Sequence, residues 1–322
     1  MPTLPETIAG ILRTTPDALI VCHVAPDGDC LGSALALALA CGQCGVQALV
    51  GSADGVPEVY RFLPGSDRIL TAPPERACAV GVAVECSSLD RAGAFAEVLA
   101  RSRTVINIDH HQSNTAFGDI VFHDPAAAAV GEQISEVIRA MAVPLTRELA
   151  QCLLTAIVTD TGRFGFPNTT PRTLRLAADL VAAGGSIPAV VERVYETRTA
   201  GGLRLLGASL QRLALAAEGR IAWTAVTPQM LQEAGAGADD VTGIVNLLRQ
   251  IRGVQVALLF EVTPDGVRVG IRSRDGVRAH AIAEAFGGGG HAGAAGFTAS
   301  GSLDDVVART LAAAEKELHA AS

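Results

Sequence analysis

The stretch that decides the fold is Ala18-Leu-Ile-Val-Cys-His-Val-Ala-Pro-Asp-Gly-Asp29, in which an apolar run passes abruptly into a polar loop. The run Ala18–Val24 has the length and the apolar, β-branched content of a short buried strand. The residues after the loop, Leu31–Ala40, are apolar over a length typical of a helix. Because parallel α/β sheets are built from strands that alternate with helices, we expect an α/β fold.

The same alternation continues through the first half of the chain. Further β-rich runs, each suited to a buried strand, occur at Val46–Val50, Ala79–Cys86 and Thr104–Ile108. Helical patterns follow at Ala129–Ala142 and Arg147–Val158. This order predicts a mostly parallel sheet with helices on both faces. Ligands bind such sheets beyond the carboxyl ends of the strands, which directs attention to the polar residues there.

The second half of the chain predicts a separate, smaller domain. From Pro171 to about Leu215 the pattern is largely helical, and a new block begins near Gly219. In that block we expect strands at Arg220–Val226, Val254–Val262 and Val267–Ile271, and helices at Asp240–Ile251, Ala279–Phe286 and Ser302–His319. We therefore expect an N-terminal domain over residues 1–195, a helical connector over 196–215, and a C-terminal α/β domain with a mixed sheet over 216–322.

The composition excludes several classes of protein. The chain has 322 residues, of which 49% are hydrophobic, so it can bury a large core and is not expected to be disordered. Its formal net charge is −8, and Lys316 is the one lysine among 25 basic residues. Because the sequence has no basic tail or stripe, we expect no binding to long duplex DNA.

Other features of the sequence bear on location. The uncharged run Cys30–Ala53 is long enough to span a bilayer, but the Gly42–Gly45 break divides it, so we expect no membrane segment. The residues Met1–Arg13 lack the pattern of a signal peptide. Seven scattered cysteines, an odd number, favour the reducing cytoplasm.

Acidic and imidazole side chains cluster where the expected strands and one helix end. Carboxylate oxygens with a few imidazoles suit Mn²⁺ or Mg²⁺ better than a thiolate-rich zinc site does. The number of such groups exceeds the needs of one ion and fits a pair of ions about 3.5–4 Å apart, the arrangement used in phosphoryl transfer. The groups are His23, Asp27, Asp29, Glu85, Asp109, His110, His111 and Asp160.

The second half carries a different signal, one that suits an anion. The glycine-rich segment Phe286–Gly296 contains four consecutive glycines followed by His291. Such a segment lets the backbone approach an anion and present several N–H groups to it. Arg272, at the end of an expected strand, can add a charged donor.

Taken together, these motifs resemble those of the DHH phosphoesterase superfamily over nearly the whole chain. The resemblance rests on His23-x-x-x-Asp27-x-Asp29-x-x-Gly32-Ser33, Asp109-His110-His111-x-Ser113-Asn114 and Thr159-Asp160-Thr161-Gly162-x-Phe164. Arg272-Ser273, Gly287–His291 and Ala294-Ala295-Gly296 resemble the DHH-associated C-terminal domain of this family. Residues 1–195 would then be the metal-binding catalytic domain, and residues 216–322 the substrate-binding domain.

The resemblance implies roles for individual residues. It implies two Mn²⁺ ions, with Mg²⁺ as an alternative, and the ligands His23, Asp27, Asp29, Glu85, His110 and Asp160. His111 would contact the scissile phosphate or the attacking water, and Asp109 would either act beside it or orient a ligand histidine. The substrate's terminal phosphate or nucleotide would be held by Arg272, Ser273, Gly288, Gly289, Gly290 and His291.

Two positions depart from the family pattern. Glu85 stands where the family usually has aspartate, at the position that bridges the two metal ions. Its extra methylene still allows bridging, but it can change metal spacing and metal preference. Gly270 stands where relatives often have a serine before the Arg-Ser pair, which can weaken one substrate contact.

The implied activity is that of the nano-RNase and pAp phosphatase branch of the family: hydrolysis of RNA of about two to five nucleotides and dephosphorylation of pAp to AMP. A phosphodiesterase acting on c-di-AMP or pApA is the alternative within the same chemistry. A non-catalytic nucleotide-binding regulator is the alternative from another class. A manganese-dependent inorganic pyrophosphatase and a long-strand exonuclease rank lower, and a homodimer is left open.

Overall fold

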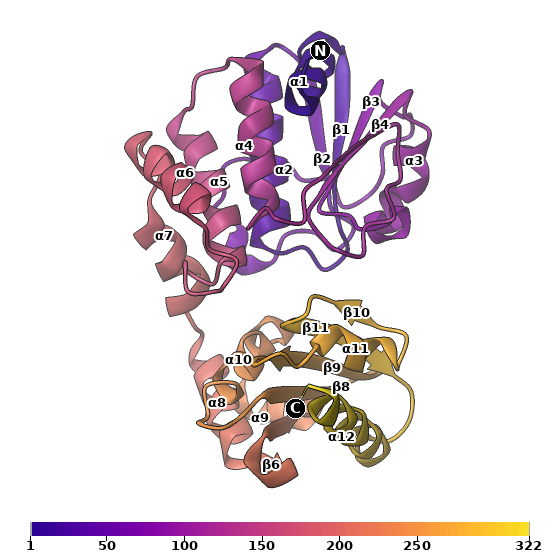
Figure 1. The fold of residues 1–322 in the computed structure, drawn as a ribbon, viewed down its shortest axis with the longest axis vertical. Coiled ribbons are helices and arrows are strands. Elements are labelled where there is room, and N and C mark those ends of the chain that lie inside the picture. Colours follow the sequence, from indigo (N-terminus) through magenta and orange to yellow (C-terminus); the bar gives the residue numbers. More distant parts are fainter. Residues whose placement is uncertain (1, 322) are drawn as a thin grey trace. The chain divides into compact units, whose positions relative to one another are not determined.

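The structure is a computed structural model, and it describes residues 2–321. The chain divides into two compact units on either side of the Thr197–Arg198 bond, and each unit has its own sheet and core (Figure 1). Helix α8, Ala200–Gln211, covers most of the interval expected to be a connector and lies in the second unit.

The first unit is built on a five-stranded sheet with the order β2-β1-β3-β4-β5, in which every neighbouring pair is parallel. This arrangement confirms the α/β fold with a parallel N-terminal sheet. The strands are β1 (Asp17–Cys22), β2 (Gln47–Gly51), β3 (Val80–Val84), β4 (Thr104–Asp109) and β5 (Ile120–His123). The edge strand β5 is short, and the sequence analysis did not anticipate it.

Helices cover both faces of this sheet. On one face lie α1 (Leu4–Thr14), α2 (Gly28–Gln43), α4 (Val130–Met141) and α5 (Arg147–Asp160). On the other face lie η3 (Leu89–Phe95) and α3 (Ala96–Ala100). In β1, Ile20 faces the first set and Leu19 the second, and both are fully buried. Burial on two faces explains why this strand is apolar from Ala18 to Cys22 and does not alternate with polar residues.

Helices α2 and α5 lie in close contact because a glycine permits it. A side-chain carbon at Gly32 would collide with the carbonyl oxygen of Cys152 on α5. Asp29 is in the first turn of α2, and Asp160 is the last residue of α5. The close packing at Gly32 therefore fixes the position of one acidic residue relative to the other. The first unit is completed by α6 (Pro171–Ala182), α7 (Ile187–Val191) and η4 (Glu192–Glu196).

The second unit is built on a six-stranded mixed sheet with the order β10-β11-β9-β8-β7-β6, in which only β7 and β8 are parallel. Its strands are β6 (Ala214–Ala216), β7 (Ile221–Val226), β8 (Val256–Thr263), β9 (Gly266–Ser273), β10 (Gly289–Gly290) and β11 (Ala294–Ala299). The mixed sheet confirms the C-terminal α/β architecture expected from the sequence.

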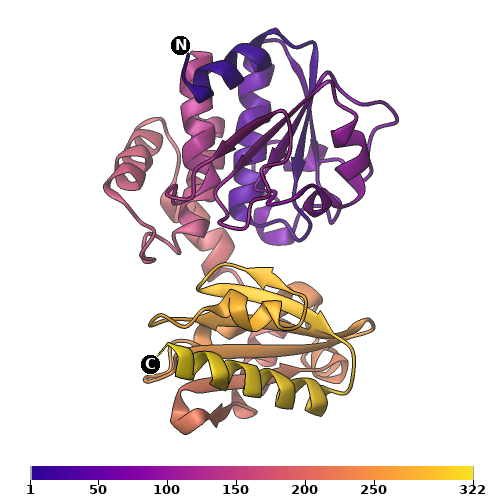
Figure 2. The same cartoon turned by 45° about the vertical axis from the view of Figure 1, so that its right-hand side comes forward.

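Alternate side chains of β8 face two separate cores in the second unit. Leu258 and Phe260 pack with α11 (Ala279–Glu284) and α12 (Leu303–Ala320), the latter running along one face of the sheet (Figure 2). Ala257 and Leu259 belong to the core formed with α8, α9 (Pro228–Ala234) and α10 (Ile244–Leu248).

One expectation about the second unit was wrong in detail. The helix expected at Asp240–Ile251 is interrupted: a short turn, η6 (Ala238–Val241), is followed by α10, and Gly243 between them has a left-handed backbone with φ of 89°. Such a backbone ends a helix and favours glycine. The glycine-rich segment forms a β-hairpin, because Gly289 pairs with Gly296 and Gly290 with Ala295.

Several features bear on the expectations about membranes and disulfides. Within residues 2–321, no single helix is long and apolar enough to cross a membrane. Two consecutive helical segments, Pro171–Ala182 and Ile187–Glu196, have enough length and apolar content only when they are taken together, and a bend of 104° separates them. The uncharged run Cys30–Ala53 is divided between α2 and β2, as the glycine break predicted. All seven cysteines are free thiols.

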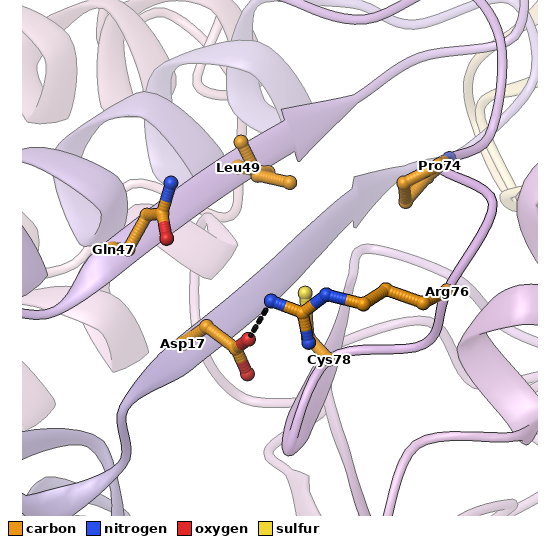
Figure 3. A pocket seen from close by; sticks show the side chains of 6 residues that line it. All are labelled: Asp17, Gln47, Leu49, Pro74, Arg76 and Cys78. Atoms are coloured by element: carbon orange, nitrogen blue, oxygen red, sulfur yellow. Dashed lines mark hydrogen bonds and ion pairs between the residues drawn. The ribbon is translucent and has the colours of Figure 1, made fainter.

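A small pocket of about 80 Å³ lies at the amino-terminal end of β1, at the edge of the sheet opposite to the polar strand ends (Figure 3). Asp17 accepts a hydrogen bond of 2.6 Å from the backbone N–H of Ala79 and forms an ion pair of 2.8 Å with Arg76. The bond from Ala79, more than the exposed arginine, lowers the pKa of Asp17. We assign this pocket a structural role.

Candidate active site

The polar residues predicted from the sequence meet at the carboxyl edge of the parallel sheet. His23 follows β1, Glu85 follows β3, and Asp109 ends β4 just before His110 and His111. Ligand atoms of Asp29, Glu85 and His110 lie within 4.8 Å of one another. Asp160 Oδ2 lies 3.9 Å from His110 Nε2, and His23 Nε2 lies 3.6 Å from Glu85 Oε2.

Asp27 begins helix α2 as its N-terminal cap. Its Oδ1 accepts hydrogen bonds from the backbone N–H groups of Asp29 at 3.0 Å and Cys30 at 3.1 Å. Burial and, after it, charges that include that of Asp27 raise the pKa values of Asp29, Glu85 and Asp160. The six predicted ligands therefore form one cluster, although their role as ligands stays a prediction.

Asp29 is fully buried and accepts three hydrogen bonds. Oδ1 accepts from the Ser33 hydroxyl and from the Gly131 N–H, both at 3.0 Å, and Oδ2 accepts from the Val130 N–H at 2.6 Å. Val130 and Gly131 are the first two residues of α4, where backbone N–H groups lack partners within the helix. Asp29 thus holds α4 in place and retains oxygen lone pairs that face Glu85 and His110.

Glu85 has two features expected of a residue under functional constraint. Its backbone lies in the left-handed region, with φ of 58°, which is uncommon for any residue other than glycine. Its side chain is buried, and Oε2 accepts no hydrogen bond from any residue within 2–321. A buried carboxylate oxygen without a hydrogen-bond donor is costly, and a cation would relieve that cost.

The two histidines of the cluster are held by backbone carbonyls so that Nε2 faces the acids. His23 Nδ1 lies 2.7 Å from the carbonyl oxygen of Val24, and His110 Nδ1 lies 3.1 Å from that of Ala127. A proton on Nδ1 of His110 leaves Nε2 with the lone pair that a metal ligand requires. His23 Nδ1 also lies 3.1 Å from Nη2 of Arg91, which donates to the Val24 carbonyl at 3.2 Å and which the sequence did not reveal as part of the site.

Asp109 and His111 form a pair beside this cluster. His111 Nδ1 lies 2.7 Å from Asp109 Oδ1, which also accepts the His111 backbone N–H at 3.2 Å. Asn114 Nδ2 donates to Asp109 Oδ2 at 2.6 Å, so both carboxylate oxygens are engaged. Burial raises the pKa of Asp109, but the hydrogen bonds from His111 and Asn114 and the charge of His111 together lower it to about 2. Asp109 therefore holds the His111 ring through Nδ1.

The electrostatics of the cluster are those of a cation site. Burial, and then the charges of neighbouring carboxylates, raise the pKa of Asp29 to about 6 and that of Asp160 to about 8. The same two causes raise the pKa of Glu85 well above its usual value. Carboxylates crowded in this way repel one another without a cation, and divalent ions would compensate the repulsion. Four carboxylates and two imidazoles thus fit a pair of divalent metal ions.

In the second unit, Arg272 on β9 is positioned by neighbouring groups. Its Nε donates to Asn246 Oδ1 at 3.0 Å, and its Nη1 donates to the carbonyl oxygen of Ile271 at 2.9 Å. Burial, and then the charge of Arg249, lower its pKa. Two guanidinium groups brought near each other favour an anion between them. The sequence analysis did not find Asn246 or Arg249, which lie in the segment expected to be one regular helix.

The other predicted substrate-binding residues differ in exposure. Ser273 is buried, and its hydroxyl lies 2.6 Å from the carbonyl oxygen of Val277 and 2.8 Å from that of Ala292, so it joins two segments of the unit. Gly289, Gly290 and His291 are exposed on the hairpin. Gly288 contacts the backbone of Gly296 so closely that no side chain fits there. The hairpin therefore presents backbone to solvent, as an anion-binding segment would.

The loop after Asp160 is a further feature that the sequence did not reveal. Gly162, Arg163 and Phe164 have consecutive left-handed backbones with φ of 54°, 63° and 63°. The guanidinium carbon of Arg163 lies 4.8 Å from the ring centre of Tyr195. Non-glycine residues held in this conformation store strain, which gathers at functional sites.

Comparison with known families agrees with this architecture. Residues 17–157 match the N-terminal domain of the DHH family, and residues 221–320 match the DHHA1 domain. The chain belongs to the DHH family and carries its associated C-terminal DHHA1 domain.

Among individual proteins, the chain is 37% identical to the bifunctional oligoribonuclease and PAP phosphatase NrnA of Thermus thermophilus, over 97% of this chain and 93% of that protein. It shares its fold with an exopolyphosphatase-related protein from Bacteroides fragilis, with a TM-score of 0.90 and 23% identity over 97% of this chain and 96% of that one. RecJ from Thermus thermophilus, in complex with Mn²⁺, matches with a TM-score of 0.57 and 15% identity over 98% of this chain and 55% of RecJ.

Proposed function

We propose that the chain is a metal-dependent phosphoesterase that hydrolyses RNA of about two to five nucleotides to mononucleotides and converts pAp to AMP. The observation that carries the proposal is the 37% identity, over nearly the full length of both chains, to an enzyme named for these two activities. The acidic cluster at the carboxyl edge of the first sheet supplies the chemical means, since it gathers four carboxylates and two imidazoles.

The metal ligands in this proposal are the residues of the cluster, and the ions are two Mn²⁺. The proposed ligands are His23, Asp27, Asp29, Glu85, His110 and Asp160. The unpartnered Glu85 Oε2 and the raised pKa values of the buried acids support such a site. Two imidazoles favour Mn²⁺ over Mg²⁺, which prefers oxygen ligands and retains water. RecJ, which has the same fold, is known in complexes with each of these ions.

The chain's own residues carry out the remaining steps. A bound metal pair would lower the pKa of a water molecule so that hydroxide forms near neutral pH. His111, held through Nδ1 by Asp109, would contact a phosphate oxygen or the attacking water through Nε2. The hydrogen bond to Asp109 fixes the orientation of the ring for that contact.

The second unit is proposed to bind the end of the nucleotide substrate. Arg272 supplies a guanidinium whose orientation is fixed by Asn246, and Arg249 adds a second charge nearby. Gly289 pairs with Gly296 in the hairpin, so the exposed backbone of Gly290 is the part that offers an N–H to a phosphate. Ser273, with its hydroxyl engaged by two carbonyls, supports the hairpin and does not itself contact substrate in this proposal.

A substrate panel tests the proposal. The purified protein in Mn²⁺ buffer would be given pApA, pAp, c-di-AMP, inorganic pyrophosphate and a long single-stranded RNA, with the His110→Ala variant as the background control. We expect rapid turnover of pApA and pAp. Preference for c-di-AMP, for pyrophosphate or for the long RNA would replace the proposed substrate class. No hydrolysis of any substrate at any Mn²⁺ concentration would instead indicate a nucleotide-binding regulator.

The free state of all seven cysteines supports a reducing compartment, and we therefore propose that the enzyme works in the cytoplasm.

A further inference from the structure

Cys30 places a thiol against two of the proposed metal ligands. Its Sγ, the ligand nitrogen of His23 and a carboxylate oxygen of Glu85 all lie within 4.8 Å of one another, and all three residues are buried. Cys30 directly follows Asp29 in the first turn of α2, at a position that the family motif leaves free. Among residues 2–321, this is the one such group that combines sulfur, nitrogen and oxygen donors.

The Cys30 side chain is held by two backbone groups. Its Sγ donates to the carbonyl oxygen of Val84 at 3.4 Å and accepts the backbone N–H of His23 at 3.3 Å. These contacts fix the sulfur beside the His23 ring and the Glu85 carboxylate. Glu85 Oε2, buried and without a hydrogen bond from any described residue, completes the group.

The neighbouring thiols do not share this arrangement. Cys22 Sγ lies 3.9 Å from the carbonyl oxygen of Cys30, and Cys86 Sγ lies 3.6 Å from that of Val84. Neither belongs to a group with imidazole and carboxylate donors among the described residues. The proximity of Cys30 to the metal cluster is therefore a property of this one side chain.

We propose that His23, Cys30 and Glu85 form a binding site for a single thiophilic divalent cation, such as Zn²⁺ or Cd²⁺, which competes with the Mn²⁺ pair. Nitrogen, sulfur and oxygen ligands at about 2.0–2.3 Å from a tetrahedral ion lie about 3.5 Å apart, so a small contraction of the group is enough to hold one. On binding, a bond forms between the metal and Sγ, and the thiol proton passes to solvent.

The competition follows from the shared ligands, and in this respect the inference rests on the proposed function. An ion held by His23 and Glu85 removes two ligands from the Mn²⁺ pair. Thiolate ligands select Zn²⁺ and similar ions, whereas Mn²⁺ prefers oxygen. Low concentrations of Zn²⁺ would therefore inhibit the Mn²⁺ enzyme, and Cys30 would set the sensitivity.

Absorption spectroscopy with Co²⁺ and Cd²⁺ tests the site without relying on activity, because thiolate ligation gives a near-ultraviolet sulfur-to-metal charge-transfer band. The pair Cys41 and Cys44 could also bind these ions, so the titrations would use the full chain carrying Cys41→Ala and Cys44→Ala. Cys30→Ser would be compared in this background with Cys152→Ala, a control that removes another fully buried thiol, on α5.

We expect the band in the background protein and in the Cys152→Ala variant, its loss in Cys30→Ser, and a loss of Zn²⁺ affinity of at least about tenfold. Excess Mn²⁺ should also diminish the band. Absence of the band in the background protein, or its survival in Cys30→Ser, would overturn the proposal.

If the background protein does not fold, Cys30→Ser alone should weaken the wild-type band, and an unchanged band would count against the site. Full Mn²⁺-dependent hydrolysis by a protein that lacks the band would reject this site and leave the proposed function intact. Absence of hydrolysis by the wild-type protein would contradict the proposed function instead.

Discussion

The two candidate binding regions of this molecule are opposite in charge and in construction. The cluster in the first unit is acidic and mostly buried, with Asp27 at its exposed side, and hydrogen bonds to the backbone fix Asp27, Asp29 and His110. The region in the second unit is basic, and its hairpin residues Gly289–His291 are exposed. A rigid acidic cluster suits ions of fixed size, whereas exposed backbone and guanidinium groups suit a substrate that must enter and leave.

The sharpest test of this contrast is His110→Ala, which removes a proposed ligand together with its contact to the backbone carbonyl of Ala127. Changes in groups that merely orient ligands already cost about 10–100-fold, so we expect a loss in kcat of more than about 100-fold. His319→Ala, on the exposed face of α12, is the control. Steady-state hydrolysis of pApA measures the effect, and near-normal turnover would remove His110 from the site.

The next largest effect should come from Asp109→Asn. An amide cannot hold the His111 imidazole as the carboxylate does, so we expect kcat to fall by about 10–100-fold with Mn²⁺ affinity nearly unchanged. The pH profile of kcat should shift as well, which a purely structural loss would not cause. Asp179→Asn, exposed on α6, is the matched control. A large fall in Mn²⁺ affinity would instead make Asp109 a metal ligand.

Arg272→Ala probes the basic region. A hydrogen bond to a charged group is worth about 1.5–3 kcal/mol, so KM for pAp should rise by about ten- to a hundredfold while kcat changes little. Arg268→Ala removes a more exposed arginine of the same strand, paired at 3.6 Å with Glu261, and should leave KM unchanged. Equal effects of both variants would mean that Arg272 has no special contact with substrate.

Metal binding should stabilise the first unit. A ligand at 100 times its Kd adds about 2.7 kcal/mol to the free energy of unfolding, so saturating Mn²⁺ should raise Tm by several degrees. Differential scanning calorimetry with Mn²⁺ or EDTA measures this shift. Glu85→Gln should reduce it, since Glu85 Oε2 has no hydrogen-bond donor to replace a cation. An identical shift in wild type and variant would exclude Glu85 as a ligand.

The smallest effect concerns Asp17, at the opposite edge of the same sheet. Because its pKa is lowered in the folded protein, it contributes stability above the unfolded pKa near 4, and this contribution is lost as pH falls through the folded value. Asp17→Asn should therefore cost about 1–2 kcal/mol at neutral pH and less below about pH 3. Urea unfolding at both pH values measures the difference, and activity should not change.

The sequence predicted the acidic region better than the basic one, for a physical reason. In a parallel sheet the carboxyl ends of the strands share one edge, so finding buried strands that end in His23, Glu85 and Asp109 was enough to bring these residues together. Hydrogen bonds between a side chain and a backbone group far away in the sequence cannot be predicted from where the strands end. The attachment of Asp29 to Val130 and Gly131 depends on how α4 packs, which no local pattern reports.

In the second unit, local signals were weaker and one misled. The apolar pattern of Asp240–Ile251 suggested one helix, but the left-handed backbone at Gly243 divides it, and Asn246 and Arg249 lie beyond that break. The sequence of the glycine-rich segment did not predict its hairpin, because glycine has low strand propensity. Its pairing with β11 comes from tertiary contacts, which override propensity.

The three hydrogen bonds accepted by Asp29 have a practical consequence for experiments at this site. Asparagine, the usual charge-neutral replacement for aspartate, has one acceptor oxygen, and its amide group would point hydrogens at the N–H of Val130 or Gly131. Such a variant would loosen the start of α4 as well as removing a charge. The Asp29 carboxylate holds the start of α4 and is also a proposed metal ligand. Inactivity of an Asp29 variant would therefore say nothing about metal binding until the fold of the variant had been verified.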